Sequence, residues 1–129
     1  MDDGCIPTGC TVATGQWTDP WSGFTSTQAS DFQIDHLVPL ANAWRSGAAG
    51  WDGPRREAFA QNLGDPDELN ALHGPVNTAK SDKAPDQWKP PLQQSWCRYA
   101  TAWVRIKATW ALTVTATEKS ALASMLERC

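Results

Sequence analysis

The chain has 129 residues, which is the size of one domain built around a single hydrophobic core. An apolar content of 41% and a charged content of 19% exclude a disordered acidic chain. The net charge of −3 argues against a protein that grips nucleic acid across a broad basic face, but not against an enzyme that contacts a few phosphates at one site.

No run of 18 apolar residues occurs, so we expect no membrane-spanning segment. The segment after Met1, DDGCIPTGC, has no basic region and no apolar region, so we expect no signal peptide there. Cysteines stand at positions 5, 10, 97 and 129, and an even number in a small chain favours disulfides and a secreted protein. Their spacings do not offer the two CxxC-like pairs of a zinc site. Of the three possible connectivities we favour Cys5–Cys10 and Cys97–Cys129.

The N-terminal third predicts two strands. Residues 10–17, CTVATGQW, alternate weakly between polar and apolar side chains and predict a strand, and residues 18–30 form a turn-rich segment. Residues 31–38, DFQIDHLV, predict a second strand. Pro39 ends it, because proline has no N–H to donate to a strand ladder.

The middle of the chain predicts short elements that begin with proline. Residues 39–47 and 53–64 each favour a short helix with proline near its start and glycine at its end. Residues 68–72, ELNAL, can form a short strand. Residues 74–83, GPVNTAKSDK, then start a helical turn at the proline, and residues 84–91 read as a loop.

From Gln93 onward the pattern is that of a long helix. Trp96, Trp103 and Trp110 recur every seven residues, and Tyr99, Ala100 and Ile106 lie on the same side. A stripe of this kind faces a core far more often than it offers an aromatic platform to bases or sugars.

A second C-terminal helix follows. Thr115 and Glu118 have the spacing of a capping box, and the helix after them is lined by Leu122, Met125, Leu126 and Cys129. Two antiparallel helices of similar length over residues 93–129 bring Cys97 beside Cys129, which is why we favour that bridge. In the chain-entropy model it adds about 3–4 kcal/mol of stability.

Asp35 and His36 lie side by side in an otherwise apolar run, where a charge is costly unless it is paired or bound to a metal. Some forty residues later, Asn77 and Lys80 share one face of a helical turn. Oxygen donors from Asp35 and Asn77, together with a histidine, form an open site that suits magnesium or manganese better than zinc. Neighbouring strand residues point to opposite faces, so Asp35 and His36 reach one site only where the strand bends, as Pro39 favours. Taken alone, the two residues are equally consistent with a structural pair in which the carboxylate fixes the imidazole.

IDHLVPL followed by LNALHGPVNTAKSDK resembles the HNH endonucleases of the ββα-metal class, whose signature is a D-H pair on one strand and N-x-x-K on the following helix. The segments REAFAQNL, WCRYATAWV and the C-terminal cysteine are similar to the small secreted HNH nucleases of actinobacteria, and the resemblance covers roughly residues 9 to 129. It implies an α+β fold in a single domain over residues 1–129. A ββα-metal core would lie at about 31–84, with a disulfide-stabilised helical hairpin at about 93–129.

The resemblance also implies roles for individual residues. Asp35 and Asn77 are the expected metal ligands, with Mg²⁺ as the expected ion and Mn²⁺ or another divalent ion as the alternative. His36 is the expected general base that takes a proton from the attacking water, a task suited to histidine because its reference pKa is about 6.5. Lys80 is expected to contact or neutralise phosphate.

The chain departs from the family pattern in three places. Where Glu68 stands, the family often has an asparagine that orients the catalytic histidine, so Glu68, Asn70 and Asn62 are the candidates for that role. Where His73 stands, the family often has an acidic residue, and His73 is either a further ligand or, as we favour, a loop histidine. The family usually carries a longer N-terminal portion, of which only eight residues precede GCTV here.

The expected activity is metal-dependent hydrolysis of phosphodiester bonds in DNA, with RNA as a possible substrate, by a secreted monomer. No helix rich in arginine or asparagine is present to read a major groove, so we expect little sequence specificity. One alternative is an HNH toxin domain, which would have an immunity protein as its partner. Another is a non-catalytic, tryptophan-rich binding module of a secreted protein.

Overall fold

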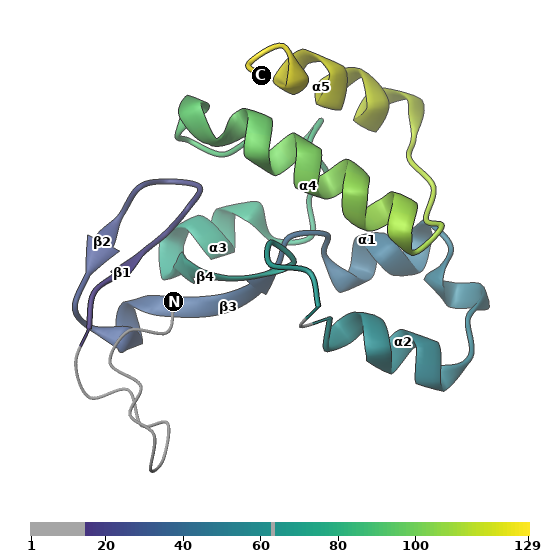
Figure 1. The fold of residues 1–129 in the computed structure, drawn as a ribbon, viewed down its shortest axis with the longest axis horizontal. Coiled ribbons are helices and arrows are strands. Elements are labelled where there is room, and N and C mark those ends of the chain that lie inside the picture. Colours follow the sequence, from purple (N-terminus) through teal and green to yellow (C-terminus); the bar gives the residue numbers. More distant parts are fainter. Residues whose placement is uncertain (1–14, 63) are drawn as a thin grey trace.

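The computed structural model describes residues 15–62 and 64–129, and within them the chain forms five α-helices and two small antiparallel sheets, an α+β arrangement (Figure 1). The strands are β1 (Trp17–Thr18), β2 (Thr25–Ser26), β3 (Phe32–His36) and β4 (Leu69–His73). The helices are α1 (Leu40–Arg45), α2 (Gly53–Ala60), α3 (Gly74–Lys80), α4 (Trp96–Thr109) and α5 (Ala116–Leu126). None of the helices in these ranges is long and apolar enough to span a membrane.

The first sheet pairs β1 with β2 in a short hairpin, which includes the end of the strand predicted over 10–17. Most of that predicted strand, and the predicted Cys5–Cys10 bridge, lie outside the described residues. Asp19, in the hairpin turn, is fully buried. Its carboxylate accepts hydrogen bonds from the main-chain N–H of Trp21 at 2.7 Å and of His73 at 2.8 Å. This residue therefore ties the first hairpin to the end of β4.

The second sheet pairs β3 with β4, with Asp35 opposite Asn70 and His36 opposite Leu69. Strand β3 ends two residues before the predicted end. The N–H of Leu37 still donates to the Glu68 carbonyl at 2.7 Å, but the N–H of Val38 donates to a Glu68 side-chain oxygen at 3.0 Å and Pro39 follows. Strand β4 lies one residue later than predicted. His73 is consequently its last residue and not a loop residue.

Helices α1 and α2 lie between the two strands in sequence, and α3 follows β4 directly and packs against both strands. Asp52 caps α2 by accepting a hydrogen bond from the Arg55 N–H at 2.9 Å, and Pro54 lies in its first turn. The helix ends at Ala60, four residues before the predicted Gly64.

Helices α4 and α5 form the predicted antiparallel hairpin along one side of the molecule (Figure 1), and the Cys97–Cys129 disulfide joins their ends with a Cα–Cα distance of 5.1 Å. Thr115 caps α5 by accepting from the Glu118 N–H at 3.1 Å, but the reciprocal half of the predicted capping box does not form. The Glu118 carboxylate turns inward, where it accepts from Trp103 Nε1 at 2.7 Å and pairs with Lys107 Nζ at 2.8 Å. The Glu118 carboxylate is therefore buried with two partners and does not cap the helix.

The core lies between the α4–α5 hairpin and the rest of the chain; its fully buried large side chains include Trp21, Leu37, Val38, Leu72, Tyr99, Trp103, Ile106 and Met125. The predicted tryptophan stripe therefore faces the core: Trp103 is buried in it, and Trp96 and Trp110, the latter at the C-cap of α4, are partly buried and pack against it. Because Leu37 and Val38 follow Asp35 and His36 directly, the carboxyl end of β3 is anchored in this core.

Candidate active site

One face of α3 runs along one face of β3. Gln33 and Asp35 share a face of the strand because side chains alternate, and Asn77 and Lys80 share a face of the helix because they are three residues apart. Asn77 Nδ2 donates to Gln33 Oε1 at 2.6 Å, and Lys80 Nζ lies 3.0 Å from Asp35 Oδ2. The structure thus brings three of the predicted site residues, Asp35, Asn77 and Lys80, to one helix–strand contact.

Lys80 is fully buried, which differs from the expectation that it contacts phosphate. Besides its ion pair with Asp35, its Nζ donates to the main-chain carbonyl of His36 at 2.9 Å. Burial lowers the pKa of Lys80 and raises the pKa of Asp35, while the attraction between the two groups opposes both shifts. Lys80 therefore holds the Asp35 carboxylate and the end of β3 in place, and it offers no ammonium to the surface.

The His36 ring leaves the opposite face of β3 and reaches α2, where Nε2 lies 2.7 Å from the carbonyl oxygen of Ala60. A carbonyl oxygen only accepts, so Nε2 carries the proton, and in the neutral ring Nδ1 is the unprotonated nitrogen. Ala60 is the last residue of α2, and the last carbonyls of a helix have no partner within it. The end of α2 therefore fixes both the tautomer and the orientation of the imidazole.

This contact corrects the prediction that Glu68, Asn70 or Asn62 orients His36. Asn70 Nδ2 donates to the Asp67 carbonyl at 2.6 Å, and Glu68 Oε1 accepts from the Val38 N–H. Within the described residues, none of the three side chains hydrogen-bonds to the imidazole. The main-chain carbonyl of Ala60 orients His36 instead, and it can do so because α2 ends at Ala60.

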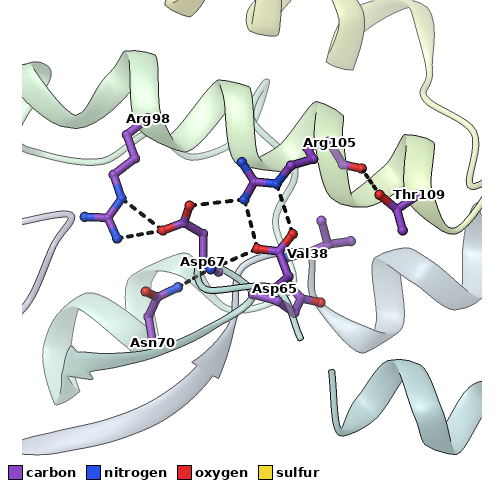
Figure 2. A network of polar contacts seen from close by, with 8 residues as sticks. Val38, Asp65, Asp67, Asn70, Arg98, Arg105 and Thr109 are labelled. Atoms are coloured by element: carbon purple, nitrogen blue, oxygen red, sulfur yellow. Dashed lines mark hydrogen bonds and ion pairs between the residues drawn. The ribbon is translucent and has the colours of Figure 1, made fainter. Parts of the chain in front are cut away.

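The loop before β4 is bonded to α4 through Asp65 and Asp67, as Figure 2 shows. Arg98 bonds to the Asp67 carboxylate at 2.6 Å, and Arg105 bonds to Asp65 at 2.8 Å and to Asp67 at 3.1 Å. The hydrogen bond from Arg105 lowers the pKa of Asp65. These arginines are partly exposed, so each pair contributes little stability alone, but together they fix where β4 begins.

Glu68 is fully buried, and burial raises the pKa of its carboxyl to about 8. One oxygen accepts from Val38, while Oε2 has no hydrogen-bond partner among the described residues. A protonated acid satisfies this environment better than a carboxylate, because only the carboxylate carries a charge that burial penalises. Glu68 therefore acts as a buried neutral hydrogen-bonding group at the end of β3.

We expect Glu68→Gln to flatten the pH dependence of folding. The folded-state pKa of Glu68, about 8, lies above its ordinary value of 4.5, so its contribution to stability is full below pH 4.5 and is lost as the pH rises toward 8. Glutamine cannot ionise, and its oxygen can still accept from Val38. Urea unfolding between pH 5 and 8 should show the wild type losing up to about 1.4 kcal/mol more per pH unit than the variant. Equal slopes would contradict the burial argument, and exposed Glu127→Gln is the matched control.

His73 does not lie with the other candidates. It pairs with Phe32 at the far end of the hairpin, and three residues of strand, roughly 10 Å, separate that end from Asp35. Its ring stacks on Phe24 with centroids 3.6 Å apart. The structure gives His73 a packing environment and does not bring it to Asp35.

Asp35 and Asn77 fit a hard divalent ion by the chemistry of their donors. Within the described residues, Oδ1 of each side chain has no hydrogen-bond partner, while the other terminal atom is held by Lys80 or Gln33. In the same part of the chain no three His, Cys, Asp or Glu side chains cluster as a metal cage. A sparse set of oxygen ligands is typical of Mg²⁺, which keeps several waters and is shared with substrate phosphates.

Comparison with known proteins relates the chain to one domain of a restriction endonuclease family. The family model for the C-terminal domain of GmrSD restriction endonucleases matches residues 9–125. An "Uncharacterized secreted protein" of Arthroderma benhamiae is 50% identical over 120 residues, which are 93% of this chain. The chain spans 58% of the length of that relative. No solved structure matches the chain.

Proposed function

Because the chain belongs to the family of GmrSD restriction endonuclease C-terminal domains, we propose that it is a metal-dependent endonuclease that hydrolyses phosphodiester bonds in DNA, and possibly in RNA. The observation that carries the proposal is the His36 ring, fixed through Nε2 by the Ala60 carbonyl and left with Nδ1 free. The order β3, β4 and α3, with α3 against the hairpin, supports a ββα-metal core for this chain.

In this proposal His36 takes a proton from the attacking water at Nδ1, and the Ala60 carbonyl keeps the ring oriented while the proton moves. Asp35 and Asn77 hold a divalent ion, which when bound supplies charge stabilisation for the scissile phosphate. Lys80 keeps the Asp35 carboxylate in place through their buried ion pair. Since β3 ends at His36, a phosphate that lies across this end can meet both neighbouring side chains although they leave opposite faces of the strand.

The protein is proposed to act outside the cell as a monomer. Its relative is named a secreted protein, and the Cys97–Cys129 disulfide is of a kind that persists in oxidising compartments. Broad substrate use is expected, because no described helix presents the row of arginine or asparagine side chains that reads base edges in a major groove.

The test is cleavage of supercoiled plasmid, of single-stranded DNA and of RNA with Mg²⁺ or Mn²⁺. We expect nicking with metal, none with excess EDTA, and recovery when Mg²⁺ is added back in excess over the chelator. Cleavage that continues unchanged in EDTA contradicts the metal requirement. Substrate that stays intact with each ion contradicts the proposed nuclease activity. A protein that binds nucleic acid but never cuts it would instead be the non-catalytic, tryptophan-rich binding module.

A further inference from the structure

A small apolar pocket lies between α1 and α2, the two helices that sit side by side in Figure 1. Its volume is about 180 Å³, below the roughly 300–1,000 Å³ of sites for drug-sized ligands. Trp44, Trp51, Phe59 and Leu40 form its aromatic and aliphatic walls. The size and the lining fit one planar ring system and no larger ligand.

Trp44 and Leu40 are the two lining residues of this pocket that are also exposed large apolar side chains. Trp44 is 49% exposed, and of the eight tryptophans, which all lie in the described part of the chain, it is the only one among the exposed large apolar residues. The Arg56 guanidinium lies over the Trp44 indole, 5.1 Å from the centre of the ring. Arg56 is in turn held by hydrogen bonds to the Trp51 carbonyl, the shorter of 2.6 Å. Trp44 is therefore an exposed indole whose position is set by Arg56, and an indole of this kind can stack on an aromatic ligand.

The pocket adjoins the candidate active site. Ala60 lines it and also supplies the carbonyl that holds His36. Leu40, on the other wall, is four residues after His36 and begins α1. Arg56 is the one charged residue among the eight that line the pocket, all of them described, and its charge is positive. A strand whose phosphate lies at His36 therefore passes a cation and an aromatic pocket directly beyond it.

We propose that this pocket binds one unpaired base of a nucleic-acid strand, with Trp44 stacking on the base and Arg56 facing the negatively charged backbone. The inference rests on the proposed function for the direction in which the strand runs. Aromatic stacking and a cation at the rim are the two features by which proteins bind single strands without reading their sequence. A paired base is buried in its own stack and cannot enter, so the pocket favours single-stranded or locally unpaired substrate.

The test measures binding without cleavage. Fluorescence anisotropy in EDTA would compare a labelled single-stranded DNA with a strand of equal length whose central nucleotides are abasic, and with a duplex. Wild type should bind the normal strand more tightly than the other two. Since a stacked base contributes about 1–3 kcal/mol, Trp44→Ala should weaken binding of the normal strand about 5- to 150-fold and abolish its advantage over the abasic strand.

Trp44→Phe should keep most of the advantage, and Val104→Ala, a change at an exposed apolar residue on α4, should leave binding unchanged. Circular dichroism checks that each variant is folded. If Trp44→Ala does not fold, Leu40→Ala replaces it as the pocket variant. Equal affinity for normal and abasic strands, or for wild type and folded pocket variants, overturns the proposal. If the affinities are equal but the protein still cleaves with Mg²⁺, the pocket proposal fails and the proposed nuclease activity does not. If the expected binding is seen without any cleavage, the pocket proposal is supported and the proposed nuclease activity is contradicted.

Discussion

His36→Ala should reduce metal-dependent cleavage by about 10²- to 10⁴-fold, which is the usual contribution of a general base. The reason is the hydrogen bond at the ring: the Ala60 carbonyl holds Nε2 at 2.7 Å, so Nδ1 is free to accept the proton of the attacking water. Initial rates of plasmid nicking at saturating Mg²⁺ measure the effect.

A matched variant separates the two functions of the ring. His36→Gln carries an amide that can still donate to the Ala60 carbonyl, but it cannot take a proton from water. It should therefore be as stable as the wild type in thermal unfolding and as inactive as His36→Ala. If His36→Gln keeps more than about one tenth of the wild-type rate, orientation and not proton transfer explains the role of the histidine, and another group is the base.

Much of this site follows from local patterns in the sequence. The apolar run around the D-H pair predicts a strand that Pro39 ends, and β3 forms there, although it ends at His36, two residues before its predicted end. The three-residue spacing of Asn77 and Lys80 predicts a shared helix face, and that face lies against Gln33 and Asp35. The antiparallel hairpin and the Cys97–Cys129 bridge likewise follow from helix length and periodicity.

Other features depend on tertiary contacts that no local pattern records. Lys80 reads as a surface lysine because its long charged side chain usually reaches water, and only the packing of α3 on β3 buries it. The partner of His36 is a main-chain carbonyl, and any residue at position 60 could supply it. The inward turn of Glu118 depends on Lys107 and Trp103, which lie on another helix. The Ala60 contact needs the end of α2, which differs by four residues from its predicted end.

Lys80→Met should lower the free energy of unfolding by about 3–5 kcal/mol, because it leaves the Asp35 carboxylate buried without its partner. Urea unfolding at pH 7 measures the loss. The control is Arg45→Met, which breaks the ion pair with Asp82; both partners there are 54% exposed, so a loss of at most about 1 kcal/mol is expected. The double variant Asp35→Asn, Lys80→Met should recover part of the stability, since an amide is cheaper to bury than an unpaired charge.

The same variant decides between two roles for Lys80. A lysine that contacts phosphate would, when replaced by methionine, weaken substrate binding and leave stability nearly unchanged. A buried lysine that positions Asp35 does the opposite, because its loss is felt in folding before any substrate is present. A Lys80→Met protein with wild-type stability and a raised KM would therefore contradict the buried ion pair. It would also return Lys80 to the role that the family resemblance implies.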